Sequence, residues 1–264
     1  MKKLIEWLNK DLVFVDLGAA SAVDNKLLSP FYSSLTLIEL DAINDSLIDK
    51  DKYFRRVMIK NGVAGKPGSR VLKLRAYPYT SSFLEPKNKL VGDYGLEPLF
   101  QVQRDVSIEC NTLSEILHDL EIDHIDFLKT DLEGMDYEVL SGSAELLKNT
   151  LSLQCELRFQ PFYEGEPSLF SAGRYLEQCG FELIWLRPEA WKYKTPRRAM
   201  EREGRWVFAD AVFFKSWQSL TDQYGPGVGK AVAKQIIVAC ALGHFNYAEY
   251  LLAKIEKILG AELV

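Results

Sequence analysis

Small residues and acids at the ends of two apolar stretches could bind a nucleoside. Asp16 and Gly18 end an apolar run that begins at Leu12, and Glu39 ends the next such run, 21 residues beyond Gly18. An acid about 20 residues after a glycine turn is typical of the carboxylate that accepts the hydroxyls of an adenosine ribose. The expected cofactor-binding residues are Asp16, Gly18, Ala19, Ala20, Ser21, Glu39, Leu40, Asn61, Gly62, Val63 and Asp131.

The turn after Asp16 lacks glycines that a dinucleotide would need. Counting from Gly18, Ala20 and Val23 stand where the Gly-x-Gly-x-x-Gly pattern has its second and third glycines, so a pyrophosphate cradle is incomplete. NAD is therefore disfavoured. S-adenosyl-L-methionine carries adenosine without a phosphate and needs only a turn that admits its methionine end, so it is the expected cofactor.

Three carboxylates follow two later apolar runs and could carry out chemistry on a methyl acceptor. Asp131 and Glu133 come after the run that ends at Thr130, and Glu156 ends the run that begins at Leu151. Methyl transfer requires alignment of the acceptor and usually removal of its proton. We expect Asp131 to contact the methionine end of the cofactor or the acceptor hydroxyl, and Glu156 to orient the acceptor or act as base, with Glu133 as the third catalytic candidate. Helix capping is the alternative for Asp131 and Glu133, because a helix dipole stabilises an acid at its start.

The three histidines are poorly placed to act as the base. His118 and His124 precede the apolar run Ile125–Thr130, whereas the acids follow such runs, so in a parallel sheet these histidines would lie at the edge opposite to the acids. His244 lies near the C-terminus. Acids at the ends of adjacent strands could also bind Mg²⁺, which prefers oxygen ligands. We expect no metal ion and keep a Mg²⁺ site as the alternative.

A basic segment stands out in an acidic chain. Seven Lys and Arg side chains against three Glu fall between residues 187 and 205, although the whole chain has a net charge of −5. Trp191 and Tyr193 interleave these charges. Aromatic faces suit sugars and Arg suits carboxylates or phosphates, so we expect a substrate lid for an anionic or glycan acceptor, with a solvated loop as the alternative. The expected substrate-binding residues are Arg158, Trp191, Arg197 and Arg198.

The elements that must position these residues alternate between short apolar runs and longer amphipathic ones, which is typical of a parallel sheet with crossover helices. Ligands bind at the carboxyl ends of the strands in such sheets, where the acids lie. A capping box at Thr112 predicts a helix over Thr112–Leu120, and a 3.6-residue spacing predicts helices over Asp136–Lys148 and Ser168–Cys179. The expected strands are Leu12–Leu17, Leu35–Leu40, Arg56–Asn61, Ile125–Thr130, Leu151–Glu156, Phe181–Leu186 and Ala209–Phe214, with an accessory ribbon at Val71–Leu74 and Val106–Ile108.

A C-terminal helical hairpin follows the main unit. Gly225, Pro226 and Gly227 punctuate the chain, and helical patterns follow over Lys230–Leu242 and Ala248–Leu259. We expect a cofactor-binding domain over residues 1–222 and an αα-hairpin appendage over 223–264. The hairpin either packs against its own domain or forms a homodimer contact.

Composition limits the class of protein. The chain has 264 residues, 47% hydrophobic and 26% charged, which is typical of a globular protein. Its net charge of −5 argues against a nucleic-acid partner, and its four cysteines form no C-x-x-C pair. No apolar stretch approaches about 18 residues, so we expect no membrane association and a cytoplasmic location.

Several motifs resemble the FkbM family of S-adenosylmethionine-dependent methyltransferases. The most specific lies at Ile125–Gly134, Ile-Asp-Phe-Leu-Lys-Thr-Asp-Leu-Glu-Gly, followed by Val139-Leu140-x-Gly142; Asp16-Leu17-Gly18-Ala19, Ile38-Glu39 and Thr112-Leu113 add to it. The resemblance covers roughly residues 12–215. Two positions depart from the family pattern: Ala20 stands where a second turn glycine is usual, and Arg158 stands near a position where many members have histidine.

The resemblance implies an α/β fold of the class I methyltransferase type. This is a Rossmann-like seven-stranded sheet of order 3-2-1-4-5-7-6 with strand 7 antiparallel, here with a C-terminal helical hairpin. The implied activity is O-methylation of a hydroxyl on a glycan or natural-product acceptor. A regulatory protein that binds an adenosine cofactor without catalysis is the alternative, because a fold can persist without its chemistry.

Overall fold

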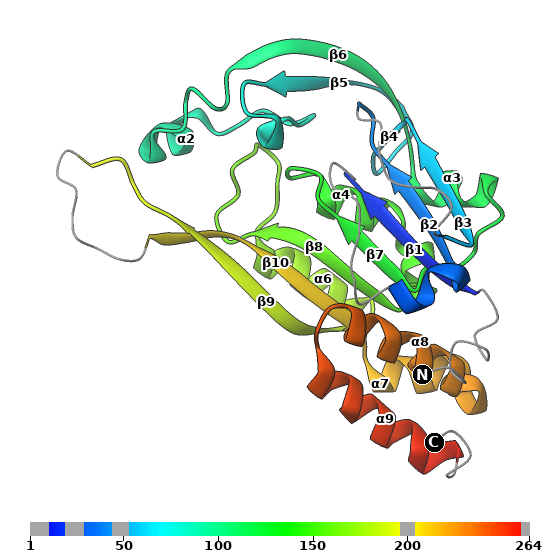
Figure 1. Cartoon of the computed structure of the whole chain (residues 1–264). Coiled ribbons are helices and arrows are strands. Elements are labelled where there is room, and N and C mark those ends of the chain that lie inside the picture. Colours follow the sequence, from blue (N-terminus) through cyan, green and yellow to red (C-terminus); the bar gives the residue numbers. More distant parts are fainter. Residues whose placement is uncertain (1–10, 19–28, 44–52, 196–203, 260–264) are drawn as a thin grey trace.

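The main sheet has seven strands in the order that the family resemblance implies. The computed structural model describes residues 11–18, 29–43, 53–195 and 204–259, the last of these with side chains as far as residue 256 (Figure 1). The sheet order is β3-β2-β1-β7-β8-β10-β9, which reads 3-2-1-4-5-7-6 when its strands are numbered along the chain. The last strand along the chain is antiparallel to both of its neighbours, and the other pairs are parallel. These strands are β1 (Leu12–Leu17), β2 (Leu35–Leu40), β3 (Arg55–Ile59), β7 (Phe127–Thr130), β8 (Ser152–Arg158), β9 (Phe181–Trp191) and β10 (Arg205–Lys215).

Helices cover both faces of this sheet. Side chains along a strand alternate between the two faces, so the buried apolar strands need cover on each side. Val13 and Val15 of β1 pack in one cluster with Leu117, Leu140 and Leu176, whereas Phe14 packs on the other face. The first face is covered by α3 (Leu113–Asp119), α4 (Asp136–Gly142), α5 (Ala144–Lys148) and α6 (Leu169–Gln178). The second is covered by the 3₁₀ helix η1 (Ser29–Ser34) together with α8 (Val228–Ala241) and α9 (Phe245–Leu259), and α7 (Trp217–Tyr224) packs against α8.

The C-terminal hairpin shares its core with the sheet. Ile237 and Val238 of α8 lie in one hydrophobic cluster with Phe14 of β1, and Lys234 of α8 forms an ion pair with the buried Asp126 at 3.0 Å. The predicted boundary between residues 222 and 223 falls inside α7. The division into two domains and a homodimer contact through the hairpin stay predictions.

A second, three-stranded sheet lies over the carboxyl ends of the main strands. Its order is β4-β6-β5, from β4 (Gly62–Val63), β5 (Gly68–Arg75) and β6 (Val102–Asn111), and Figure 1 shows β5 and β6 curving over the top of the molecule. The predicted accessory ribbon is part of this sheet. Between β5 and β6 the chain forms the 3₁₀ helix η3 (Pro78–Thr80) and α2 (Asn88–Tyr94). The amide of Lys194, just beyond β9, donates to the carbonyl of Asp93 in α2 at 2.8 Å, which ties this insertion to the main sheet.

Two predictions of local structure have different outcomes. The capping box is confirmed: Thr112 Oγ1 accepts from the Glu115 amide at 3.1 Å, and Glu115 Oε2 accepts from the Thr112 amide at 2.9 Å. The single helix predicted over Asp136–Lys148 is wrong, because Ser143, with φ of −119°, separates α4 from α5. The break comes where Gly142 packs directly against Gly65 of the neighbouring loop. No helix in the described part of the chain is long and apolar enough to cross a membrane.

Candidate active site

Two cavities meet at the carboxyl edge of the main sheet. The smaller, of about 240 Å³, lies beside the turn after β1 and is here called the turn cavity. The larger, of about 780 Å³, is here called the aromatic cavity, because eight rings line it: Tyr77, Tyr79, Tyr94, Phe100, Phe162, Tyr163, Trp191 and Phe208. Tyr79, Asp131 and Glu133 line both cavities. A group passed between ligands in the two cavities would therefore pass these three residues.

The turn cavity collects most of the predicted cofactor-binding residues that the structure describes. Its walls include Gly18, Leu40, Asn61, Gly62, Val63 and Asp131. Ala19, Ala20 and Ser21 lie outside the described residues. Asp16 and Glu39 are fully buried and are not in its walls. Asp41, which the sequence prediction missed although it lies two residues beyond Glu39, does line the cavity.

Gly18 is required where the turn after β1 passes the end of β7. Its φ is +79°, a left-handed conformation that favours glycine, and a Cβ atom here would overlap the carbonyl oxygen of Asp131. Backbone hydrogen bonds fix this crossing, because the Gly18 amide donates to Leu40 and the Asp131 amide donates to Leu17, at 2.9 and 3.1 Å. The turn therefore sets the position of Asp131 between the two cavities.

The acids at the ends of β1 and β2 have cationic partners in the protein. Arg56 Nε of β3 donates to Glu39 Oε2 at 2.6 Å, and Lys129 Nζ of β7 donates to Asp16 Oδ1 at 3.1 Å. Burial raises the pKa of Asp16 to about 6, although Lys129 opposes this shift. The second oxygens, Glu39 Oε1 and Asp16 Oδ2, are buried and have no hydrogen-bond partner within the described ranges.

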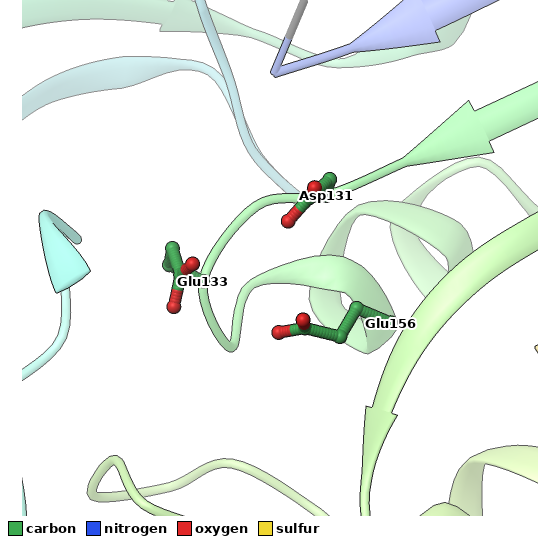
Figure 2. A group of neighbouring side chains, drawn as sticks. All are labelled: Asp131, Glu133 and Glu156. Carbon is green, nitrogen blue, oxygen red and sulfur yellow. The ribbon is translucent and has the colours of Figure 1, made fainter. Parts of the chain in front are cut away.

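Three predicted catalytic carboxylates converge where the cavities meet. One oxygen from each of Asp131, Glu133 and Glu156 lies within 4.8 Å of the other two, and Figure 2 shows the three side chains pointing toward a common space. Arg158 Nη2 lies 2.7 Å from Glu133 Oε2 and 2.8 Å from Glu156 Oε1. One guanidinium group thus bridges two of the three acids.

Burial shapes the protonation of this cluster. Burial, with the nearby Asp131 carboxylate, raises the pKa of Glu133 to about 7, although Arg158 opposes the shift. Burial also raises the pKa of Glu156 well above its usual range, again against Arg158. Burial disfavours the charge of Arg158 itself, but the carboxylates around it outweigh that effect and raise its pKa. Glu133 is therefore a carboxyl group poised to exchange a proton near neutral pH.

The loop between β8 and α6 supports the cluster, which the sequence prediction did not foresee. Glu166 Oε1 accepts from Arg158 Nε at 3.0 Å, and its Oε2 accepts from the amides of Phe162 and Tyr163 at 2.8 and 3.1 Å. Glu133 has φ of +48°, and a Cβ atom on Gly134 would lie 2.8 Å from Tyr163 Cδ2. Glu166 matches no motif, so no signal in the sequence could have identified it.

A metal ion would compete with Arg158 for this cluster. The spacing of the three carboxylates would admit a cation. However, the guanidinium already occupies the position between Glu133 and Glu156, and Arg158 is only 5% exposed. A divalent ion bound to both acids would lie against this guanidinium, which Glu166 holds by Nε, and repulsion between the two positive charges is costly in a buried site. We therefore assign no metal ligands.

The predicted substrate-binding residues lie in different environments. Trp191 is in the wall of the aromatic cavity. Arg158 is at its floor, with Nε and Nη2 engaged by carboxylates. Arg197 and Arg198 lie outside the described residues. The prediction missed Tyr77, Tyr79 and Phe100, which reach the cavity from the insertion under the second sheet.

Fold and site together define a Rossmann-like methyltransferase, with ligand cavities at the carboxyl edge of its sheet. The chain belongs to the FkbM methyltransferase family, because the model of the methyltransferase FkbM domain matches residues 46–183, more than half of its length. No curated protein matches the sequence.

Solved structures that resemble the chain have low sequence identity to it. Methyltransferase FkbM from Methylobacillus flagellatus is 12% identical with a TM-score of 0.40, over 77% of this chain but only 43% of that protein. A protein of the NADB-Rossmann superfamily from Streptococcus agalactiae is 12% identical with a TM-score of 0.33, over 98% and 95% of the two chains. The m1A22 tRNA methyltransferase TrmK from B. subtilis is 12% identical with a TM-score of 0.28, over 98% and 96%.

Proposed function

We propose that this protein is an S-adenosyl-L-methionine-dependent O-methyltransferase that acts on a hydroxyl group of a glycan or natural product. The observation that carries the proposal is that Asp131 and Glu133 line both cavities. The turn cavity would hold the cofactor and the aromatic cavity the acceptor. Asp131 and Glu133 would then lie at the point of transfer.

The residues of the turn cavity suit an adenosine cofactor. Asp41 offers a carboxylate in the wall, and Gly18 and Gly62 let a ligand approach the backbone. S-adenosyl-L-methionine would supply an electrophilic methyl group in this cavity.

Glu133 is the group that we assign as base. It lines both cavities, whereas Glu156 lines only the aromatic cavity. A carboxyl group with a pKa of about 7 is partly ionised at neutral pH and can take the proton that the acceptor hydroxyl loses. Glu156, held by Arg158, would orient the acceptor through a second hydroxyl.

The aromatic cavity suits an uncharged, hydroxyl-rich ring better than an anion. Arg158 cannot readily receive an anionic group, because its Nε and Nη2 already donate to carboxylates. Asp131, Glu133 and Glu156 lie beside this guanidinium, and each of them would repel a carboxylate or phosphate whenever it is ionised. Aromatic walls pack against the apolar faces of sugars, so a glycan hydroxyl fits both walls and floor.

The test is an acceptor screen with the full chain. Mass spectrometry would follow S-adenosylhomocysteine formation and a gain of one methyl group on neutral glycosides and polyketides, with glucuronides as the anionic comparison. We expect turnover with a neutral acceptor, unchanged in excess chelator and reduced at least about 100-fold in Glu133→Gln, as for loss of a general base. Cofactor binding by calorimetry without turnover on any acceptor would favour the regulatory alternative.

A further inference from the structure

The hydroxyl group of Tyr163 lies between a backbone carbonyl group and the carboxyl group of Glu133. The side chain is 1% exposed, in the loop between β8 and α6. Its hydroxyl oxygen lies 3.0 Å from the carbonyl oxygen of Thr80 and 3.2 Å from Glu133 Oε2. The phenol therefore has two neighbours that could each accept its single proton.

One proton cannot satisfy both neighbours when Glu133 is ionised. A backbone carbonyl only accepts hydrogen bonds, and so does a carboxylate. If Tyr163 donates to Thr80, its oxygen faces Glu133 Oε2 with no hydrogen between them; if it donates to Glu133, the Thr80 carbonyl loses this donor. A proton on Glu133 resolves the conflict, because Glu133 then donates to Tyr163 while Tyr163 donates to Thr80.

The acids around Glu133 favour the same protonated form, although the charge of Arg158 favours the ionised one. Arg158 also pairs with Glu156 through Nη2 and with Glu166 through Nε, so its guanidinium keeps two carboxyl partners when Glu133 is protonated. The acids of its own segment add repulsion to a charged Glu133. The titratable and charged groups that face Glu133 are Arg158 and Glu156 from β8, Arg75 from β5, Tyr163 from the following loop, and Asp131 and Asp136 from its own segment.

We propose that Tyr163 is a positioning residue that donates to the Thr80 carbonyl and accepts a hydrogen bond from protonated Glu133, so that the site is built around the product state of proton transfer. The inference rests on the proposed function. In that step the acceptor oxygen forms a bond to the methyl carbon as the sulfur–methyl bond breaks. The bonding pair stays on sulfur, and the hydroxyl proton moves to Glu133, which later releases it to water.

The test measures the pKa of Glu133 without any turnover. Protein labelled with ¹³C at glutamate carboxyl carbons is titrated by NMR, with Glu133→Gln to assign the signal, in wild type and in Tyr163→Phe. Phe keeps the ring and removes the hydroxyl, so protonated Glu133 loses the oxygen to which it donates its hydrogen bond. We expect its pKa to fall by at least about half a unit, a threefold change in the proton-binding constant. If Tyr163 donated to the carboxylate instead, its loss would raise the pKa; a rise or no change overturns the proposal.

Kinetics and a control separate this role from a structural one. We expect Tyr163→Phe to lower kcat about tenfold with little change in KM for the cofactor. Tyr175→Phe is the control, because it removes a hydroxyl from α6 outside this network. We expect it to leave both the pKa of Glu133 and kcat unchanged. Should the Phe variant fail to fold, a neutron structure of the wild type decides, because a proton directed from Tyr163 to Glu133 contradicts the proposal. The titration also stays readable without methyl transfer, so failure of the proposed function is seen separately.

Discussion

Glu166 Oε1 accepts a hydrogen bond from Arg158 Nε at 3.0 Å, and this contact directs Nη2 of the same guanidinium toward Glu133 and Glu156. The contact sets the orientation of a buried cation, because a guanidinium is planar and fixing Nε fixes the direction of Nη2. Glu166 is itself held by two backbone amides. The loop after β8 thus positions the charge that organises the cluster.

Glu166→Gln should weaken this arrangement. Loss of a charge-assisted hydrogen bond in a buried site lowers the free energy of unfolding by about 1–3 kcal/mol. We expect kcat for methyl transfer to fall about tenfold and cofactor affinity to stay within about twofold, because the turn cavity does not include Glu166. Urea denaturation and steady-state kinetics give both values. Glu164→Gln, at an exposed position of the same loop, is the control, and equal losses in both variants would contradict the assignment.

Gly18→Ala should disrupt the crossing between the turn and β7. The substitution forces a Cβ atom onto the Asp131 carbonyl at a φ of +79°, so we expect a loss of at least about 1 kcal/mol in stability and loss of cofactor binding. Gly173→Ala is the matched control. Gly173 lies in α6 with open space around its would-be Cβ, where alanine should stabilise the helix by about 0.5–1 kcal/mol. Thermal unfolding and calorimetry measure both effects.

The sequence predicts the strands and the acids better than the surroundings of those acids. β1 and β2 match their predicted bounds because both are mostly apolar and every residue of each is buried between two covered faces. Asp131 and Glu156 come together as predicted because the carboxyl ends of parallel strands share one edge. Arg158, in contrast, was expected to bind substrate, and its role depends on residues 133, 156 and 166, which only the folded chain brings together.

The insertion between β5 and β6 explains most of what could not be predicted. Its tyrosines lie in a segment with no clear 2.0 or 3.6 periodicity, so nothing local indicates that Tyr77 and Tyr79 form a wall of the larger cavity. The same limit applies to Asp41. A residue spacing of about 20 suits several neighbouring positions equally well, and only the direction of the chain after β2 decides which carboxylate faces the cavity.

Asp41 and Glu39 should therefore differ in what they support. We expect Asp41→Asn to weaken binding of S-adenosylhomocysteine about tenfold with a change in unfolding free energy under about 0.5 kcal/mol, because Asp41 lines the cavity. Glu39→Gln removes one charge of the buried ion pair between Glu39 and Arg56, so we expect it to destabilise the fold by about 3 kcal/mol. Calorimetry and urea denaturation separate the two effects. Weaker binding in Glu39→Gln at full stability would instead assign the cofactor contact to Glu39.

Activity should rise with pH through the pKa of Glu133. The base must be ionised, so kcat falls by about tenfold per unit below pH 7 and levels off above it. A stopped assay with saturating cofactor and acceptor measures the profile. Asp131→Asn removes a neighbouring negative charge and should move the midpoint of the remaining activity to lower pH, because repulsion from Asp131 no longer disfavours the ionised form of Glu133. A midpoint that stays fixed would indicate another base.

Stability should change with pH in the opposite direction at a second buried acid. Burial raises the pKa of Asp136 to about 7, from an ordinary value of 3.8. Between these two pH values Asp136 is protonated in the folded state and ionised in the unfolded state. The contribution is fully present below about pH 4 and is lost as pH rises to about 7. Asp136→Asn cannot ionise, so we expect it to gain about 2–4 kcal/mol relative to wild type between pH 4 and pH 8. Urea denaturation at both values measures the difference; parallel pH profiles would contradict it.

The hairpin should depend on Lys234 more than on Lys230. Lys234 of α8 is 5% exposed and pairs with the fully buried Asp126 at 3.0 Å, so Lys234→Ala leaves a buried carboxylate without that partner and should cost about 3–5 kcal/mol. Lys230 is half exposed and pairs with Asp11, so Lys230→Ala should cost less than about 1 kcal/mol. Chemical denaturation compares the two variants. Replacing both partners, Lys234→Met with Asp126→Asn, should recover most of the loss, because the charges are removed together and the asparagine oxygen can still accept from the Val13 amide. No recovery would show that α8 needs the charge itself.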